Sequence, residues 1–457
     1  MSEQTQFVRQ ATLKSEDKSH FEKINKAIRT YHQAVEKGQS DVFKDWQAAR
    51  RVAAQIKEQA LLQLPELLIQ FEANIKKQGA QVLWAKDGHE ALGYVWNIFK
   101  ENQAELAIKA KTMVAEEIHL NQFLQGQGIE LWETDLGELI VQLAGERPYH
   151  IVTPAMHKSL KEISELFQKK IGIPPTESAE TLTQAARHFL RDKFIRSAIG
   201  ITGANFLIAD AGAIVMTENE GNGSLCMTLP KTHIVLAGIE KIIPKLTDLS
   251  LFLPLLAVSG TGQQLTSYNS IVWGPKQVHE VDGPEKMYVI LIDNGRSKLY
   301  RSERFRESLR CIRCGACLNA CPVYRTVGGH TYGTTYQGPI GALITPFLRG
   351  MREWFHLPYA SSLCGACRDV CPVQIDIHHL LLEHRKMAVE GNFSGIIWKA
   401  IMKLWVILMM RRAVLNFLRP VIFFLTHYGT FLLPSDIKKH IPKLSPMSFE
   451  GEWRKKS

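Results

Sequence analysis

The chain has 457 residues, too many for one ordinary hydrophobic core, so two or three domains are expected. Apolar residues make up 45% of it and charged residues 22%, which excludes a generally disordered chain. The formal charge is +10, and residues 380–457 hold 13 Lys and Arg against 5 Asp and Glu. This basic tail is either a solvated surface or the part that meets nucleic acid, an anionic membrane surface or an acidic partner.

The first 72 residues show the pattern of long helices. Charged residues alternate with apolar ones at spacings of three and four between Ser15 and Glu72. A helical extension over residues 1–72, packed on the next domain, is therefore expected. The opening residues lack a basic start followed by an apolar stretch, so we expect no signal peptide and a cytoplasmic location. In such a reducing compartment, clustered cysteines indicate metal binding rather than disulfides.

Residues 73–295 alternate short apolar runs with helical stretches. We expect helices at 159–170 and 180–194, consecutive strands with Gly-rich turns over 200–230, and strands at 81–85, 129–132, 150–153, 214–216, 233–236, 270–273 and 287–292. Strands separated by helices predict an α/β domain with a largely parallel sheet. No G-x-G-x-x-G motif follows a strand and no P-loop motif is present, so a nucleotide site is unsupported.

Two stretches of this domain are unusually polar: Glu133-Thr134-Asp135 with Glu138, and residues 217–223. The favoured interpretation is a helix cap for the first and a tight turn for the second. The alternative is a ligand or partner site at the strand ends, where open α/β sheets bind. Cys226 stands alone and is expected to be a buried, inert thiol.

The other seven cysteines form two runs, after a charged segment at 294–310 that is expected to be helical. The first run reads C-x2-C-x2-C-x3-C-P, the thiolate spacing of bacterial iron–sulfur clusters, and the second reads C-x2-C-x3-C-P. The runs predict electron transfer. Zinc, which also uses C-x2-C pairs, fits seven cysteines and two C-P endings poorly. The cysteines are Cys311, Cys314, Cys317 and Cys321 in the first run, and Cys364, Cys367 and Cys371 in the second.

The spacing also predicts which cysteines act together, since the last cysteine of each run in two-cluster proteins ligates the other cluster. Two [4Fe–4S] clusters are expected. Cluster one takes Cys311, Cys314, Cys317 and Cys371, and cluster two takes Cys321, Cys364 and Cys367. Ser361 stands where the missing fourth cysteine of cluster two would be. A serine oxygen, a water, a substrate atom or a partner side chain completes that site, or the cluster has three irons.

The 42 residues between the two runs favour a helical two-cluster domain over 296–390 rather than a compact β-type ferredoxin. Helical material is expected at 340–352, and the domain looks like that of the iron–sulfur subunits of succinate and glycerol-3-phosphate dehydrogenases. A Gly-rich loop at 328–341 either approaches a cluster or caps a helix. His330 within it is expected to be a hydrogen-bonded structural histidine rather than a ligand.

The C-terminal region, 391–457, begins with an apolar stretch at 396–410 in which Lys399 and Lys403 lie one helical turn apart. This predicts an amphipathic helix, either packed on the protein's own core, which is favoured, or lying in a membrane interface. The 16 uncharged residues at 420–435 include two prolines and a glycine. A spanning helix needs about 20 apolar residues, so no transmembrane span is expected.

Several stretches of the α/β region resemble the LUD domain of lactate-utilisation proteins. They are residues 201–212, 217–222 and 238–244, with Glu116-Glu117-Ile118 and residues 133–138. The resemblance implies an α/β fold like that of the sugar-phosphate isomerase and CoA-transferase group. It implies no established catalytic residue.

The order of the two regions, with Val323-Tyr324-Arg325 and residues 358–367, resembles the family of lactate utilisation protein B over nearly the whole chain. The resemblance implies a part in oxidising L-lactate to pyruvate, with a cysteine-rich partner (protein A) and a second LUD protein (protein C). We therefore expect an iron–sulfur electron-transfer subunit rather than a self-contained enzyme, with peripheral contact at the inner membrane face through the tail. The alternatives are a subunit of another dehydrogenase or disulfide reductase, a nucleic-acid-binding regulator, and an isomerase-like LUD enzyme.

Overall fold

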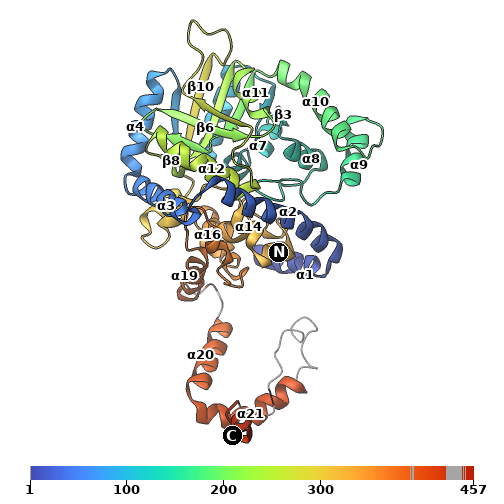
Figure 1. Cartoon of the computed structure of the whole chain (residues 1–457), viewed down its shortest axis with the longest axis vertical. Coiled ribbons are helices and arrows are strands. Elements are labelled where there is room, and N and C mark those ends of the chain that lie inside the picture. Colours follow the sequence, from blue (N-terminus) through green and yellow to red (C-terminus); the bar gives the residue numbers. More distant parts are fainter. Residues whose placement is uncertain are drawn as a thin grey trace. The chain divides into compact units, whose positions relative to one another are not determined.

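A computed structural model describes residues 2–391, 393, 396–428, 445, 447 and 449–456 of the chain. The chain divides into two units, Met1–Lys386 and Met387–Ser457 (Figure 1). The first unit contains all the described strands and all eight cysteines.

Four helices open the first unit: α1 (Glu3–Glu16), α2 (Lys18–Val42), α3 (Trp46–Leu62) and α4 (Leu64–Lys77). The side chains of Ser2, Asp17 and Asp45 cap the first three by accepting a backbone N–H of the first turn. The helices expected over 15–72 are confirmed, and α1 precedes them. In packing, α1 contacts α15 (Pro322–Val327) and α3 contacts η3 (Arg306–Arg310), so these helices meet the cysteine-bearing part of the chain.

A six-stranded sheet forms the centre of the unit, and each neighbouring pair of its strands is parallel. Its order is β1-β10-β7-β4-β2-β3. The strands are β1 (Gln81–Ala85), β2 (Leu106–Lys109), β3 (Glu130–Glu133), β4 (Ile199–Gly203), β7 (Thr232–Gly238) and β10 (Lys286–Ile292). The expected parallel sheet is thus confirmed. Strand β2 was not expected from the sequence.

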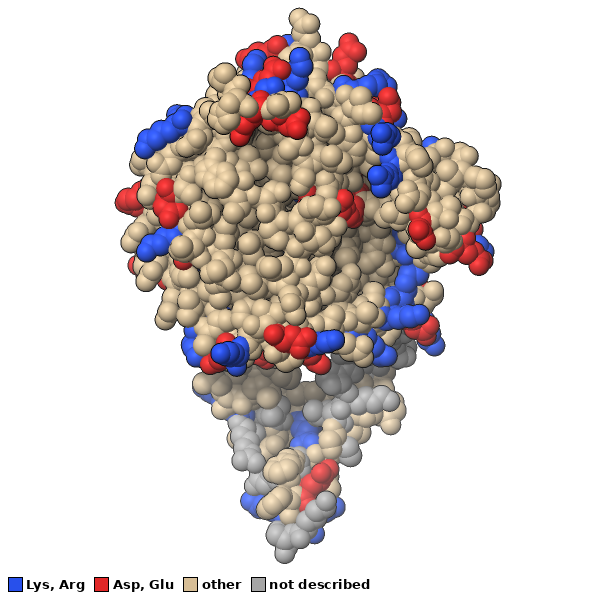
Figure 2. Space-filling view, turned by 45° about the horizontal axis from the view of Figure 1, so that its top comes forward, with Lys and Arg blue, Asp and Glu red and all other residues tan. Residues whose placement is uncertain are grey.

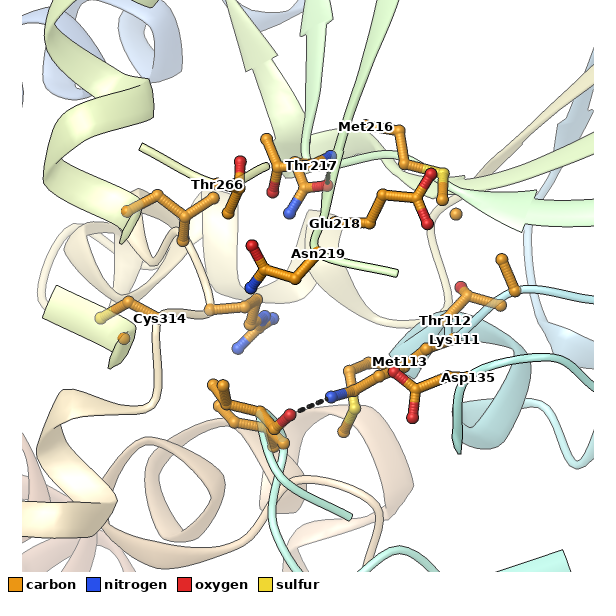
Figure 3. Close-up of a pocket in the computed structure, with 18 of the residues that line it drawn as sticks. Lys111, Thr112, Met113, Asp135, Met216, Thr217, Glu218, Asn219, Thr266 and Cys314 are labelled. Carbon is orange, nitrogen blue, oxygen red and sulfur yellow. Dashed lines mark hydrogen bonds between the residues drawn. The ribbon is translucent and has the colours of Figure 1, made fainter. Parts of the chain in front are cut away.

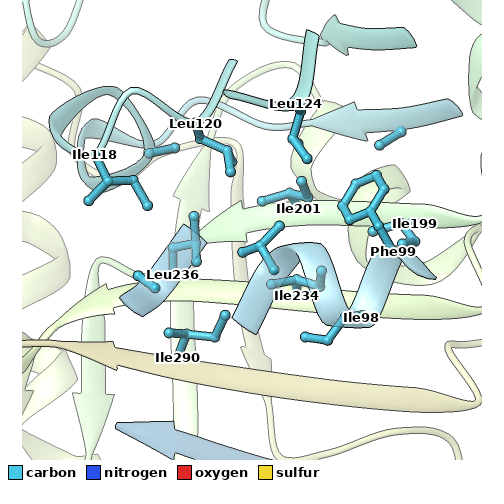
Figure 4. Close-up of a cluster of buried hydrophobic side chains, with 14 of the residues drawn as sticks. Ile98, Phe99, Ile118, Leu120, Leu124, Ile199, Ile201, Ile234, Leu236 and Ile290 are labelled. Atoms are coloured by element: carbon cyan, nitrogen blue, oxygen red, sulfur yellow. The ribbon is translucent and has the colours of Figure 1, made fainter. Parts of the chain in front are cut away.

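Both faces of this sheet are buried, as the continuous apolar runs of its central strands require. In β7, Ile234 and Leu236 point to one face, where they pack on α5 (Gly88–Glu101), α6 (Met113–Glu117) and α7 (Leu120–Gly126) (Figure 4). Val235 and Ala237 point to the other face and pack on α4 and on a second sheet. The alternation follows from the two-residue period of a strand.

The second sheet has four strands in the order β8-β5-β6-β9 and mixed directions. They are β5 (Phe206–Ile208), β6 (Ala213–Glu218), β8 (Ile242–Ile243) and β9 (Tyr268–Val272). The surrounding helices are α8 (Leu136–Ala144), α9 (Leu160–Ile171), α10 (Ala179–Arg196), α11 (Asn222–Thr228) and α12 (Leu249–Thr261), with the short turns η1 (Ile239–Lys241) and η2 (Leu246–Asp248). The helices expected at 159–170 and 180–194 are confirmed as α9 and α10.

Two strand predictions in this region are wrong. Residues 150–153 form no strand, because the Nδ1 of His150 accepts the backbone N–H groups of Val152 and Thr153 at 3.1 and 3.3 Å. Side-chain acceptors of this kind compete with strand pairing. Residues 222–228 form helix α11 instead of a strand, since the Glu218 carboxylate accepts the N–H of Gly223 at 2.6 Å and starts the turn.

From Arg296 to Glu390 every regular element is helical, and all of these residues are described. The segment expected as one helix at 294–310 is instead α13 (Arg296–Arg301) followed by η3. The material expected at 340–352 is α16 (Gly338–Arg349) and α17 (Met351–Trp354), separated at Gly350, whose φ is +115°. The other elements are α14 (Ala316–Ala320), η4 (His330–Tyr332), η5 (Leu357–Tyr359), α18 (Ala366–Asp369) and α19 (Ile377–Glu390).

The described residues of the second unit form α20 (Ile396–Met410), α21 (Arg412–His427) and α23 (Phe449–Lys456). The helix expected at 396–410 is confirmed as α20. Leu404, Trp405 and Ile407 on it are each more than half exposed. Among the described residues, no helix is long and apolar enough to cross a membrane. Most of the uncharged stretch after His427 lies outside the described residues.

Candidate metal centre and the adjoining cavity

The structure brings four of the predicted cysteines together around one small apolar cavity. Cys311 and Cys314 lie in the loop between η3 and α14, Cys317 lies on α14, and Cys371 follows α18. Burial raises the pKa of Cys371 to about 11, and the nearby thiol of Cys311 adds to the effect. The rest of the cavity lining is mostly aliphatic, with Ile151, Ile340, Ile375 and Ile377.

The other three cysteines form a second group. Burial raises the pKa of Cys367 to about 12, with further contributions from Cys321 and Cys364, so these three thiols are neighbours. Cys321 lies at the start of α15 and Cys367 on α18, and both are buried. Cys364 is exposed. The second group therefore reaches the protein surface, whereas the first is largely enclosed.

Backbone N–H groups point at three of these sulfurs. Arg313 donates to Cys311 Sγ at 3.4 Å, Tyr324 to Cys321 Sγ at 3.5 Å and Ile375 to Cys371 Sγ at 3.4 Å. Such bonds favour the thiolate, which is the form that binds iron, and they raise the potential of a bound cluster. The donor set of both groups therefore fits iron–sulfur clusters.

Ser361, at the position of the missing cysteine, is half-buried, and its Oγ accepts the backbone N–H of Leu363 at 3.1 Å. Leu363 has a φ of +56°. The serine thus shapes the turn that leads into Cys364.

The first glycines of the Gly-rich loop at 328–341 lie directly against Tyr149. A Cβ on Gly328 would lie 2.1 Å from Tyr149 Oη, and one on Gly329 would lie 1.8 Å from the Tyr149 carbonyl oxygen. Gly328 and Gly329 thus allow the loop to approach the α/β region. The sequence leaves open whether the loop approaches a cluster or caps a helix. His330 is hydrogen-bonded through Nε2 to the Arg147 carbonyl at 2.7 Å, as expected of a structural histidine.

A buried charge network joins the loop of the first cysteine group to the α/β region. Arg296 binds Glu117 through Nη1 and Nη2 at 2.8 and 2.7 Å, and its Nε binds Glu240 at 2.5 Å. The other oxygen of Glu240 accepts from Arg313 Nη2 at 3.2 Å. The Arg313 guanidinium lies 4.4 Å from the centre of the Tyr336 ring, and Tyr336 Oη donates to Glu117 at 2.6 Å.

The network sets the charge of its carboxylates. Burial alone would raise the pKa of Glu240, but Arg296 and Arg313 outweigh it and lower that pKa to about 2. Gly238 is required beside it, since a Cβ there would lie 2.1 Å from Glu240 Oε2. Lys57 on α3 donates to the carbonyl oxygens of Glu240 and Ile242 at 2.6 and 3.1 Å. The first helices, the α/β region and the cysteine loop thus share one polar core.

Both polar stretches singled out from the sequence act as helix caps. Asp135 caps α8 by accepting the N–H of Glu138 at 3.0 Å, and Glu218 accepts from Gly223 and Ser224 at the start of α11. Glu133, in the first stretch, pairs with the buried Lys109 at 2.8 Å. The favoured cap interpretation is confirmed for Asp135. For residues 217–223, Glu218 starts a helix where a tight strand connection was expected.

The same two stretches also line a cavity of about 440 Å³ at the carboxyl ends of β2, β3 and β4, against the loop that carries Cys314 (Figure 3). Parallel sheets usually bind ligands at this edge. In Figure 3, Cys314 lies at one side of the cavity, and Lys111 and Asp135 lie at the opposite side. The cavity residues include Thr112, Asn205, Thr217, Asn219, Glu220, Asn222, Lys241, Thr266 and Arg313.

The isolated Cys226 is fully buried, and burial raises its pKa to about 12. It is the inert thiol that the sequence predicts. Three groups of metal-ligand type also occur among the described residues, each with its ligand atoms within 4.8 Å. They are Glu116, Glu133 and Glu138, two of which pair with Lys109, then Glu146, His157 and His330, and Asp376, His378 and His379. Hydrogen bonds within the last two groups, such as His379 to Asp376 at 2.7 Å, account for these arrangements.

Comparison with known proteins divides the chain in the same way. Residues 68–292 match the LUD domain family and residues 307–375 match the 4Fe-4S dicluster domain family. Lactate utilization protein B of Bacillus cereus (strain B4264) is 45% identical over 351 residues, which cover 77% of this chain and 74% of the relative. The protein of that name from Bacillus thuringiensis (strain Al Hakam) is 44% identical over the same shares. A solved DUF162 family protein of Deinococcus radiodurans aligns with a TM-score of 0.30 at 15% identity, over 50% of this chain and 98% of that one.

Proposed function

Because the chain belongs to the lactate utilisation protein B family, and is an iron–sulfur protein of lactate utilisation, we propose that it is the electron-transfer subunit of a complex that oxidises L-lactate to pyruvate. The observation that carries this proposal is the arrangement of the seven cysteines in two groups. One group is enclosed beside a cavity of the LUD domain, and the other reaches the surface at Cys364. An inner and an outer redox site would together allow electrons to pass between a substrate and a partner protein.

Two clusters of the [4Fe–4S] type are proposed, with ligands drawn from both runs. Cys311, Cys314, Cys317 and Cys371 hold the first, and Cys321, Cys364 and Cys367 hold the second. The Cys371 thiol neighbours Cys311, and the Cys367 thiol neighbours Cys321 and Cys364, which supports this crossed assignment; Cys317 has neighbours in both groups. When bound, the clusters supply one-electron redox chemistry. The fourth position of the second site takes a non-cysteine ligand such as Ser361, or that site holds a three-iron cluster.

The protein's own residues have three tasks in this account. The cysteine thiolates bind iron, and the N–H groups of Arg313, Tyr324 and Ile375 stabilise their negative charge. The pairing of Arg313 with Glu240 holds the first cysteine loop against the LUD domain. The exposure of Cys364 leaves the second site open to a partner.

The finer domain scheme remains part of the proposal. It comprises a helical extension at 1–72, a LUD domain at 73–295 with the isomerase and CoA-transferase type of fold, a helical ferredoxin-type domain at 296–390, and a basic C-terminal region at 391–457. The absence of strands between 296 and 390, all of which are described, supports the helical type.

The partners that we propose are the other two lactate-utilisation proteins, the cysteine-rich protein A and the LUD protein C. The protein is proposed to act in the cytoplasm, with α20 of the tail lying at the inner membrane face. The exposed Leu404, Trp405 and Ile407, with Lys399 and Lys403 on the same helix, suit an anionic lipid surface. On the body, the face shown in Figure 2 carries charges of both signs in small groups around a broad uncharged centre. This mixed surface does not favour nucleic-acid binding.

The test is reduction of the anaerobically purified protein by L-lactate in the presence of proteins A and C. We expect the visible absorbance of the clusters to bleach only when lactate and both partners are present. Omitting one partner, or replacing L-lactate by acetate, is the control. If the complete mixture leaves the absorbance unchanged while dithionite bleaches it, the lactate assignment is wrong. Reduction by the substrate of another dehydrogenase would then favour the alternative subunit role.

A further inference from the structure

The cavity beside Cys314 has a cationic side on which several donors have no acceptor among the residues that the structure describes. The Arg313 side chain is 9% exposed and lines the cavity, yet its Nε and Nη1 have no hydrogen-bond partner among the described residues. Lys241, which is 8% exposed, also lines the cavity without a hydrogen bond or ion pair to any described residue. The hydroxyl of Thr112 at the end of β2 is buried and unpartnered as well. Buried donors without acceptors are costly, so these groups indicate an absent acceptor.

The opposite side of the cavity is acidic, but its carboxylates already have partners. Asp135 and Glu218 accept backbone N–H groups at the starts of α8 and α11, and Glu220 accepts the N–H of Leu136 at 3.0 Å. Lys111 on this side is engaged with the carbonyl oxygen of Val152. The positive groups with unused donors among the described residues of the cavity are therefore Arg313, through Nε and Nη1, and Lys241.

This distribution selects the charge of the ligand. Arg313 keeps one pairing, with Glu240, but two of its nitrogens have no acceptor among the described residues, and the Lys241 ammonium has none there either. Such donors attract an anion, and a planar guanidinium suits a carboxylate. Asp135 and Glu218 on the same cavity repel a dianion more than a monoanion, and Glu220, whose pKa burial raises to about 7, adds a partial charge. The amides of Asn205 and Asn219 and the hydroxyls of Thr217 and Thr266 offer donors and acceptors to a hydroxyl or keto oxygen.

We infer that this cavity is a binding site for a small 2-hydroxy or 2-oxo carboxylate, with the carboxylate held by Lys241 and Arg313 and the oxygen on C2 directed toward the polar wall opposite. The choice of a 2-hydroxy acid rests on the proposed function, whereas the anion site rests on the cavity alone. The volume of about 440 Å³ lies in the range of small-molecule sites, roughly 300–1,000 Å³, and leaves room for water or a longer side chain on the acid. Arg313 is also the neighbour of two predicted cluster ligands, so a bound acid contacts the loop of the first cysteine group.

The experiment measures binding of L-lactate and pyruvate to the anaerobically purified, cluster-loaded full chain by isothermal titration calorimetry. Lactamide, which lacks the negative charge, and inorganic phosphate are the comparison probes. Lys241→Gln removes the ammonium, and Lys231→Gln, at a 79% exposed lysine, is the matched control. We expect lactate and pyruvate to bind, lactamide and phosphate to bind at least tenfold more weakly, and Lys241→Gln to weaken lactate about 10- to 100-fold. Lys231→Gln should leave binding unchanged.

A second readout follows the metal centre directly. Adding lactate to dithionite-reduced protein should change the EPR spectrum of the first cluster in the wild type, and Lys241→Gln should need a higher lactate concentration for the same change. Equal binding of lactamide and lactate, preference for phosphate, or full lactate affinity in Lys241→Gln would overturn the inference. The cations would then serve only to neutralise the thiolates near Cys311.

The two proposals fail in different ways. If lactate binds here but the clusters are not reduced with both partners present, the electron-transfer role fails and the anion site stands. Lactate could also reduce the clusters although no acid binds at Lys241, either in this chain alone or in the complex. The inference then fails and the proposed function stands.

Discussion

Replacing Glu240 by Gln removes the negative charge at the centre of the network that joins the LUD domain to the cysteine loop. The carboxylate is 1% exposed and pairs with Arg296 at 2.5 Å and with Arg313 at 3.2 Å. In the variant, Arg296 keeps Glu117, but Arg313 has no carboxylate left. Losing one partner of a buried ion pair costs about 3–5 kcal/mol, because the other charge stays buried.

The assay is differential scanning calorimetry of the anaerobically purified protein. In a unit of this size the midpoint falls by roughly 2 °C per kcal/mol, so the expected decrease is about 6–10 °C. Glu285→Gln is the matched control, since Glu285 is half exposed and lies 3.9 Å from the exposed Lys231. Its midpoint should change by about 1 °C or less.

A second variant tests the cause of the loss. Adding Arg313→Met to Glu240→Gln removes the cation that would otherwise stay unpaired, so the double variant should recover part of the lost stability. The reasoning would be refuted if Glu240→Gln matched the wild type, or if the double variant were less stable than the sum of the two single changes. Protonation should mimic the substitution: the pKa of Glu240 is about 2 when folded, so its contribution is complete above about pH 4.5 and is lost as the pH falls toward 2.

Three further predictions follow from the site and the tail. Cys371→Ser should remove about half of the iron and abolish the signal of the first cluster, although this residue lies in the second run; loss of the second cluster instead would reverse the crossed assignment. His150, whose pKa burial lowers to about 3, is protonated more readily in the unfolded chain, so stability should fall as the pH drops below about 6.5. The wild type should lose about 2 kcal/mol of unfolding free energy in urea between pH 7 and pH 5 through His150, and His150→Asn should not show this loss. If the variant loses as much as the wild type, another group is responsible. Trp405→Glu on α20 should weaken flotation with anionic liposomes. Flotation equal to that of the wild type would show that α20 does not bind the membrane.

The parallel sheet and the grouping of the cysteines could be anticipated, because both depend on local patterns. Strands such as β7 and β10 are continuous apolar runs, and the spacing of Cys311, Cys314 and Cys317 limits them to one loop. Residues 150–153, which were wrongly predicted as a strand, show a similar apolar pattern. Their backbone donors are taken by the His150 ring, which is a matter of side-chain geometry that periodicity does not report.

The charge network could not be derived from the sequence. Arg296 and Glu117 are separated by 179 positions, and Arg296 is one of several arginines in a charged segment. Only folding of the sheet brings the two together. A weak signal existed, since Glu117 and Glu240 each lie in the apolar stretches that carry the LUD resemblance, and isolated carboxylates in such stretches need partners. The cavity beside Cys314 was anticipated only as the less favoured interpretation of its two polar stretches, because the same residues serve as helix caps.

The account depends most directly on the metal content of the seven cysteines. Quantified iron and acid-labile sulfide, together with EPR of the protein purified without oxygen, measure it. We predict about eight irons per chain, or about seven if the second site holds a three-iron cluster, and two distinct signals after reduction. Stoichiometric zinc with almost no iron would contradict the electron-transfer function.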